Sequence, residues 1–154
     1  MAASVRTGKQ HRKREIRVTG SHLAQELGKG AVERWSRRVL DGEKAPSVAL
    51  SITFLSERAM RDLNDRALGH DRATDVIAFR LEHVDHLVGD IYVCPVVARR
   101  SARAARVLPQ EELLRLIVHG ILHVLGHEHP ENAARVASPM WALQERYVVR
   151  LKGK

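Results

Sequence analysis

The stretch PQEELLRLIVHGILHVLGHEH, residues 109–129, decides the fold because it combines a long apolar helix with a cluster of histidines. Proline is favoured at the first position of a helix, as at Pro109, and Glu111 and Glu112 suit the positive end of the helix dipole. The residues that follow are apolar on nearly every side, and a helix of this kind is buried. We therefore expect a buried helix over 110–125 with histidines at its C-terminal end.

The histidines have the spacing of metal ligands. His119 and His123 are four residues apart, so they lie one turn apart on the same face of a helix. Gly126 stands where a helix can end in the left-handed conformation, after which the chain can fold back and bring His129 to the other two. A lone histidine on an apolar helix is more often a core residue. Three at this spacing predict one zinc ion per chain, with a fourth position open to water.

The spacing H-x3-H-x2-G-x2-H also occurs in the metzincin proteases, which carry a glutamate directly after the first histidine as the base that deprotonates water. In this chain that position is Gly120. His127 follows Gly126 at once and is expected to face solvent or the rim of a cleft, so we do not count it as a ligand. The pattern therefore predicts the ligands of a zinc hydrolase without the base of a peptidase, and a metallopeptidase is the less favoured alternative.

The rest of the chain predicts an α+β fold. Alternating apolar residues indicate strands over 15–19, 47–55, 74–82 and 87–94, the last two as an antiparallel pair. Helices are expected over 21–40, 57–68, 96–107 and 140–151, with Ser21 and Ser56 as N-caps and with Pro95 and Pro139 before the last two. We expect a single domain with a small mixed β-sheet of about four strands, packed against a helical layer that carries the metal-binding helix.

Length and composition favour a small intracellular protein. The 154 residues suffice for one domain with its own core. The single cysteine, Cys94, excludes an internal disulfide and fits a reducing compartment. The chain has no apolar run long enough to span a membrane and no apolar stretch of a secretory signal near its start. We therefore expect a cytoplasmic location and no membrane partner.

Positive charge predicts a nucleic acid partner. The formal net charge is +8, and residues 1–13 form a basic arm in front of a domain over 14–154. Such an arm suits a phosphate backbone, although a solvated tail explains it equally well. A second basic surface is expected near the metal site, because three arginines share one face of the helix over 96–107; a merely solvated face is the alternative. These arginines are Arg99, Arg103 and Arg106.

Two further segments carry a family resemblance. LVGDIYVC (87–94), followed by HGILHVLGHEH (119–129), resembles the YbeY family of bacterial endoribonucleases, the ribosomal RNA maturation factors. LNDRALGHDRATDVIAFRL (63–81) is similar to the family's segment L-N-x-x-x-R-x-x-x-x-x-T-D-V-L-S-F. The resemblance runs in the same order over residues 47–149.

This resemblance implies a cytoplasmic metalloprotein with a mixed sheet and a helical layer, and zinc on the matching residues His119, His123 and His129. The implied activity is cleavage of single-stranded RNA, in 3′-end maturation of small-subunit ribosomal RNA and in ribosome quality control. The implied partners are ribosomal RNA and the small ribosomal subunit, and no DNA partner is expected.

The chain departs from the family pattern at three positions. Glu128 stands before the last histidine in place of the usual aspartate, and Ala78 replaces the serine of T-D-V-L-S-F. Leu68 occupies the position of the family's cleft arginine. We expect another arginine of the same segment to take over that role. The candidates are Arg66, Arg72 and Arg80.

The favoured mechanism is attack of water on a phosphodiester. A water on the open zinc position has its pKa lowered toward ~7, so no strong base is needed, and nearby arginines would stabilise the charge that develops on the phosphoryl oxygens. Glu128 and Asp75 are candidates to accept a hydrogen bond from an imidazole N–H. Asp75 is explained equally well as a strand-end cap, so no general base is assigned. Leu68 also favours an alternative without catalysis, a zinc-stabilised, RNA-binding ribosome assembly factor.

Overall fold

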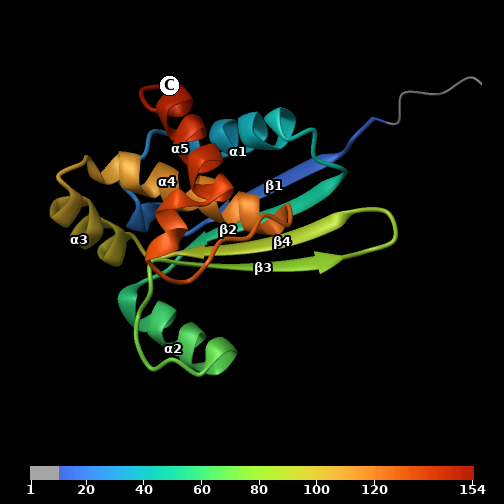
Figure 1. The fold of residues 1–154 in the computed structure, drawn as a ribbon. Coiled ribbons are helices and arrows are strands. Elements are labelled where there is room, and N and C mark those ends of the chain that lie inside the picture. Colours follow the sequence, from blue (N-terminus) through green and yellow to red (C-terminus); the bar gives the residue numbers. More distant parts are fainter. Residues whose placement is uncertain (1–10) are drawn as a thin grey trace, which may run out of the picture.

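The computed structural model describes residues 11–154. In these residues four strands, β1 (Arg14–Thr19), β2 (Val48–Phe54), β3 (Val76–Glu82) and β4 (Leu87–Val93), form one sheet in the order β1-β2-β4-β3. β1, β2 and β4 are parallel, whereas β3 pairs with β4 in the antiparallel sense. The predicted α+β domain with a small mixed sheet is confirmed, and β3 is an edge strand (Figure 1).

The helices of the described residues are α1 (Ala31–Gly42), α2 (Glu57–Leu68), α3 (Pro95–Ala105), α4 (Pro109–Val124) and α5 (Pro139–Leu151), with short 3-10 helices η1 (Ser21–Leu23) and η2 (Ala133–Ala137). All of the α-helices except α2 form a layer on one face of the sheet (Figure 1). α4 is the central helix: it packs on β3 and β4, and α1, α3 and α5 pack against it. α2 stands apart from this layer beyond one end of the sheet (Figure 1). No helix within 11–154 is long and apolar enough to cross a membrane.

The main core lies between the sheet and α4. Val48, Leu50, Ile52 and Phe54 of β2 point to the helices and are at most 3% exposed, as their alternation predicts. On α4 the residues from Leu113 to Val124 are almost all buried. α4, which carries two of the predicted metal ligands, is therefore held by packing on several sides, which gives its side chains fixed positions.

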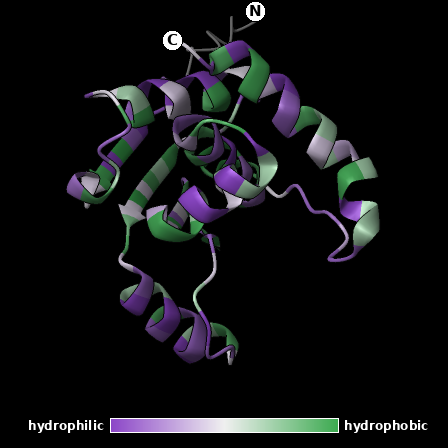
Figure 2. Cartoon of the chain, turned by 90° about the vertical axis from the view of Figure 1, so that its left-hand side faces the viewer, coloured by the Kyte–Doolittle hydropathy of each residue, from purple (hydrophilic) through white to green (hydrophobic). Residues whose placement is uncertain are grey.

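A second, smaller core fixes α2 beside the edge strand. It contains Met60, Ile77 and Cys94, all buried. Ser56 caps α2 as predicted, because its side chain accepts a hydrogen bond from the backbone N–H of Ala59. The outer surface of α2 is mostly hydrophilic (Figure 2). This core places the end of α2 and the segment that follows it next to β3.

The prediction of a helix over 21–40 is wrong for the first half of this segment. Ser21–Leu23 is a single 3-10 turn, and α1 begins only at Ala31. Ser21 does not act as a cap, since the residue before this turn is Gly20 and no side chain caps it. Gly30 has a φ of 73°, in the left-handed region, so the chain cannot run as one helix through this point.

The basic arm predicted for residues 1–13 lies outside the described residues except for its last three. Of these, Arg12 donates a hydrogen bond from its guanidinium to the carbonyl of Lys44 (2.9 Å). The carbonyl of Lys13 accepts a hydrogen bond from the backbone N–H of Val48 (2.9 Å), next to the first β1–β2 pair. Arg12 and Lys13 of the predicted arm therefore already contact the folded domain.

Candidate metal centre

The three predicted ligands meet at the C-terminal end of α4. His119 and His123 come from its last two turns, and Gly126, with a φ of 97°, reverses the chain so that His129 returns to them. The Nε2 atom of His123 lies 3.1 Å from Nε2 of His119 and 3.2 Å from Nε2 of His129. The third Nε2 pair, His119 with His129, is 3.4 Å apart. Such a group could hold one metal ion.

The Nδ1 atoms, which face away from the group of Nε2 atoms, show that the three rings are suited to bind a metal. Nδ1 of His119 faces Oε1 of Gln144 (2.7 Å), Nδ1 of His123 faces the carbonyl of His127 (3.0 Å), and Nδ1 of His129 faces the carbonyl of Pro130 (2.8 Å). Each of these partners accepts a hydrogen bond, so each neutral ring carries its proton on Nδ1 and a lone pair on Nε2. A tetrahedral zinc ion with Zn–N bonds of ~2.0–2.1 Å separates two ligand nitrogens by about 3.4 Å. The observed spacings are close to this value.

Burial favours the neutral, metal-binding form of His119 and His123. His119 is only 7% exposed, and burial lowers its pKa to about 4, although the hydrogen bond to Gln144 opposes this effect. Burial also lowers the pKa of His123, with a smaller contribution from the neighbouring His129. The positive charge of Arg135 acts in the same direction on both rings. A metal ion therefore competes with few protons at neutral pH.

The carboxylates proposed to support the ligands do not contact them. Asp75 accepts a hydrogen bond from the backbone N–H of Val76 (2.8 Å), so it caps the start of β3. Glu128 is exposed and makes no hydrogen bond to a ligand ring in the described part of the chain. The side chain that does so is Gln144 of α5. A sequence signal for it exists, because Gln144 is a polar residue at helical spacing within a buried apolar face that includes Met140 and Val148.

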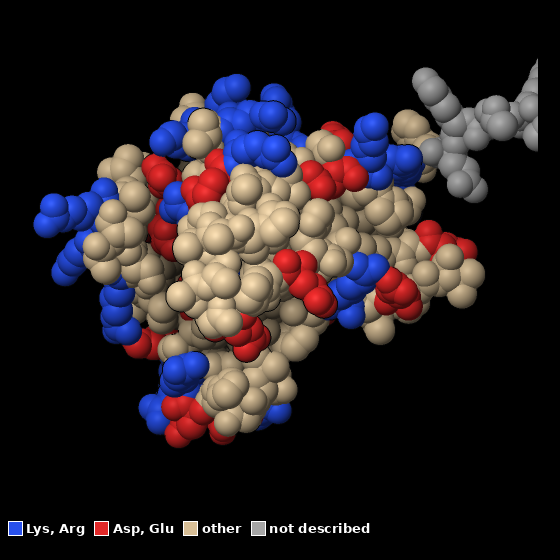
Figure 3. All heavy atoms as spheres, viewed as in Figure 1, with Lys and Arg blue, Asp and Glu red and all other residues tan. Residues whose placement is uncertain are grey.

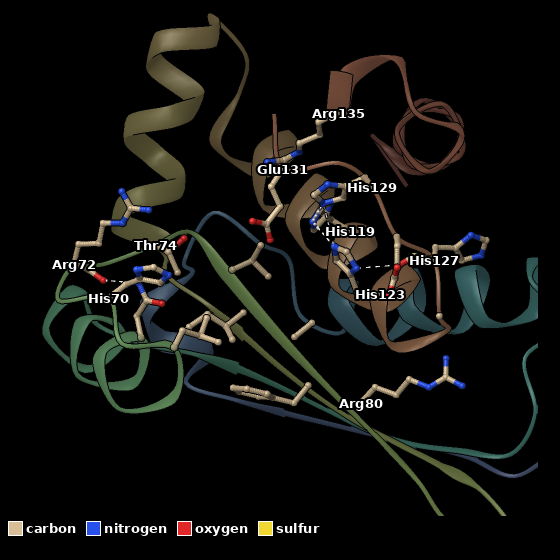
Figure 4. Close-up of a pocket in the computed structure, with 18 residues that line it drawn as sticks. His70, Arg72, Thr74, Arg80, His119, His123, His127, His129, Glu131 and Arg135 are labelled. Carbon is tan, nitrogen blue, oxygen red and sulfur yellow. Dashed lines mark hydrogen bonds between the residues drawn. The ribbon is translucent and has the colours of Figure 1, made fainter. Parts of the chain in front are cut away.

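His127 lies beside the ligand group without joining it. Its Nε2 is 3.2 Å from Oε2 of Glu43, and the other oxygen of Glu43 accepts a hydrogen bond from the hydroxyl of Tyr147 (2.7 Å). Figure 4 shows the ring of His127 turned away from the other three. Only its backbone carbonyl contacts a predicted ligand, because it accepts the hydrogen bond from Nδ1 of His123. The prediction that His127 faces the rim agrees with this placement.

The histidines form one wall of a cavity of about 870 Å³ at the sheet edge. The opposite wall comes from the end of α2, the segment that follows it and the edge strand β3. Leu68, which the resemblance aligns with the family's arginine, lines this cavity and is 52% exposed. Two carboxylates also line it, Glu128 and Glu131, and Figure 4 shows the carboxylate of Glu131 pointing into the cavity.

Three arginines line the cavity, Arg72, Arg80 and Arg135. The first two are among the predicted candidates, whereas Arg66 does not line the cavity. Sequence reasoning missed Arg135, because it lies on η2, an irregular segment with no periodic pattern.

The basic surface predicted on α3 is not part of the site, since none of its three arginines lines the cavity. Arg99 forms an ion pair with Glu26 instead. Arg106 follows the end of α3 with a φ of 57°, so it does not continue the helix face. Figure 3 shows the basic side chains of α3 along the outer side of the molecule.

The structure also explains why position 120 carries no glutamate. Gly120 faces the sheet, where a Cβ atom would lie only 2.7 Å from Cγ2 of Ile91. A glutamate here would collide with β4 and could not reach water at the metal site. The site therefore lacks the base that a zinc peptidase of this spacing uses.

Comparisons with known proteins agree with this geometry. Residues 17–152 match the family described as endoribonuclease YbeY. The Thermotoga maritima protein named endoribonuclease YbeY is 32% identical over 139 residues, which cover 90% of each chain. The protein of that name from Frankia alni is 38% identical over 125 residues, covering 72% of this chain and 68% of the relative. A solution structure of a Thermotoga maritima protein, 30% identical, superposes with a TM-score of 0.63 over 90% of this chain and 89% of the other.

Proposed function

We propose, because this chain belongs to the endoribonuclease YbeY family, that it is a zinc-dependent endoribonuclease that cuts single-stranded RNA. Membership makes it a nuclease and hence a hydrolase. The observation that carries the metal dependence is the convergence of three Nε2 atoms, 3.1 to 3.4 Å apart, on an open cavity. Nitrogen donors in this number favour zinc over magnesium or calcium, which prefer oxygen.

Different residues around the cavity would have different roles in the cleavage reaction. A bound zinc ion would supply a Lewis acid and a water of lowered pKa. The acceptors at the three Nδ1 atoms hold the rings of His119, His123 and His129 in one orientation. Arginines that line the cavity provide positive charge for phosphoryl oxygens. Glu131 is the carboxylate that we propose takes up the proton of the attacking water, because its oxygens point into the cavity.

Single-stranded RNA is the substrate that the depth of the site favours. His119 lines the cavity and is only 7% exposed, so the reacting phosphate must enter the cavity to reach the histidines. An unpaired strand can turn its backbone inward, whereas the backbone of a duplex is held by its partner strand. The net charge of +8 supports an RNA partner in general.

Within the cell, we propose that the substrate is ribosomal RNA of the small subunit, cut during 3′-end maturation and in ribosome quality control in the cytoplasm. The family resemblance supports this assignment. Mapping of small-subunit RNA 3′ ends in cells that lack the protein tests it. Extended 3′ ends are expected, and restoration requires the wild-type chain and not His123→Ala. Normal ends in the deletion strain would contradict the assignment.

The biochemical test compares four substrates under identical conditions. Purified protein is incubated with single-stranded RNA, the same sequence as duplex RNA, single-stranded DNA, and casein, with zinc, with a chelator, and with zinc restored. We expect cleavage of single-stranded RNA alone, lost with chelator and recovered with zinc. Binding of RNA without cleavage would favour the ribosome assembly factor, the second candidate function, which Leu68 in the cavity wall supports. Hydrolysis of casein would favour a peptidase.

A further inference from the structure

The three arginines of the cavity differ in what already neutralises them. Arg80 forms an ion pair with Glu82, two residues further along β3. Arg72 lies beside His70, at the end of the cavity that is distant from the three predicted metal ligands (Figure 4). Arg135 forms no ion pair with any carboxylate within residues 11–154, and its Nε is buried without a hydrogen-bond partner. Arg135 is therefore the cation of this cavity that still lacks an anionic partner close to the histidines.

Arg135 is fixed both at its backbone and at its guanidinium group. Its backbone N–H donates to the carbonyl of Asn132 (3.0 Å), and its own carbonyl accepts from the backbone N–H (3.1 Å) and hydroxyl (2.6 Å) of Ser138. Its guanidinium carbon lies 5.6 Å from the ring centre of Trp141. Stacking on tryptophan orients the planar guanidinium while leaving its N–H groups free to donate. The guanidinium is therefore held in a fixed position, and no carboxylate of the described residues forms an ion pair with it.

The charges in the cavity favour an anionic ligand for Arg135, because neither of the carboxylates that line it, Glu128 and Glu131, forms an ion pair with Arg135 in the described residues. The guanidinium and a metal ion on the three histidines would face the same cavity with the same sign and would repel each other. A phosphodiester between them removes this repulsion, because one oxygen can face the metal while another accepts from the guanidinium. We propose that Arg135 binds the scissile phosphate and performs the task that Leu68 cannot. This proposal rests on the proposed endoribonuclease function and identifies the residue that recognises the substrate there.

The kinetic test compares arginine variants of the zinc-loaded enzyme on single-stranded RNA. Arg135→Gln is expected to lower kcat/KM by about a hundredfold, mostly in kcat, because contacts to a developing oxyanion act in the transition state. Arg135→Lys should recover part of this loss, since lysine keeps the charge but not the planar fork. Arg103→Gln, exposed on α3 and outside the cavity, is the matched control for loss of one charge. All variants should keep the zinc content of the wild type.

Arg135→Gln within threefold of the wild type would overturn the proposal, as would a larger loss in Arg72→Gln or Arg80→Gln. Binding separates this failure from failure of the proposed function. Zinc-loaded protein is titrated with a short single-stranded oligonucleotide that carries either phosphodiester or neutral methylphosphonate links, and tryptophan emission is followed. Even if no RNA is cut, the proposal predicts that the phosphodiester alone changes the tryptophan emission, that Arg135→Gln abolishes this change and that it is also absent in Trp141→Phe. The same response to both oligonucleotides, or in both proteins, would refute it.

Discussion

Nδ1 of His119 on α4 donates a hydrogen bond to Oε1 of Gln144 on α5 over 2.7 Å, and the two residues are 25 positions apart in the chain. Both side chains are buried, so water cannot replace either partner. The amide of Gln144 is itself oriented, because its NH2 group donates to Glu145. The tautomer and the direction of the His119 ring are therefore set by a residue outside the histidine motif.

Gln144→Met should weaken zinc binding without removing a ligand. The substitution keeps the volume but removes the acceptor for Nδ1, and loss of such a partner typically costs 10–100-fold in metal affinity. Competition with a chromogenic chelator measures this change. Gln144→Glu, which keeps an acceptor oxygen, is the control and should bind zinc at least as tightly as Gln144→Met. Equal affinity of wild type and Gln144→Met would contradict the positioning role.

His123→Ala and His127→Ala should differ in metal content. His123 contributes an Nε2 atom to the ligand group, whereas the ring of His127 contacts Glu43. The wild type is expected to hold about one equivalent of zinc, His123→Ala to lose most of it, and His127→Ala to retain it. Elemental analysis after dialysis gives the result. Equal losses from both variants would mean that the third ligand is assigned incorrectly.

The metal-free protein should lose stability as the pH falls from about 6.5 to about 4. His119 has a pKa of about 4 in the folded state against its ordinary 6.5. In this window the unfolded chain takes up a proton that the folded chain excludes, so acid favours unfolding. The loss is on the order of 3 kcal/mol. Urea unfolding in chelator at several pH values measures it, and His119→Asn should show a smaller loss. Parallel curves for the two proteins would contradict the assignment to this residue.

Gly120→Ala should destabilise the protein although alanine is the better helix former. Propensity alone predicts a gain of about 1 kcal/mol. The added Cβ would lie 2.7 Å from Ile91, and forced overpacking of this kind costs roughly 1–3 kcal/mol. Gly28→Ala, with no atom within 4 Å of the new Cβ, is the control and should change stability little. Stabilisation by Gly120→Ala in urea unfolding would show that α4 can move away from β4.

Removal of residues 1–10 should reduce the salt dependence of RNA binding. The cut is placed here because Lys13 already pairs with β2. It deletes Arg6 and Lys9, and on single strands each phosphate contact contributes about 0.7 to the slope of log affinity against log salt. The slope should fall by about 1.4 while zinc content stays constant. An unchanged slope would show that these two cations do not contact RNA.

Local sequence determined most of the elements and identified the candidate metal ligands. The alternation in β2, the proline at the start of α4 and the spacing of His119, His123 and Gly126 act over a few residues, so their consequences can be derived from backbone geometry alone. The incorrect prediction of one helix over 21–40 also has a local cause. The spacing of apolar residues indicated a helix, whereas the left-handed conformation of Gly30 interrupts it. The family resemblance added the activity, which no local pattern contains.

Only the tertiary structure decided what surrounds the ligands. Gln144 and Arg135 reach the histidines from segments that follow them, and Leu68 and Arg80 reach the cavity from segments that precede them. The direction in which Gly120 faces depends on how α4 rests on β4. Contacts of this range are selected by the packing of the whole core, because burial depends on which surfaces fit together and not on their order in the chain. Packing also decided the outcome for Glu128 and Asp75. Glu128 precedes His129 in the sequence and Asp75 lies in the T-D-V segment, yet neither forms a hydrogen bond to a ligand imidazole in the described residues. Asp75 is instead the strand-end cap that the sequence offered as its alternative.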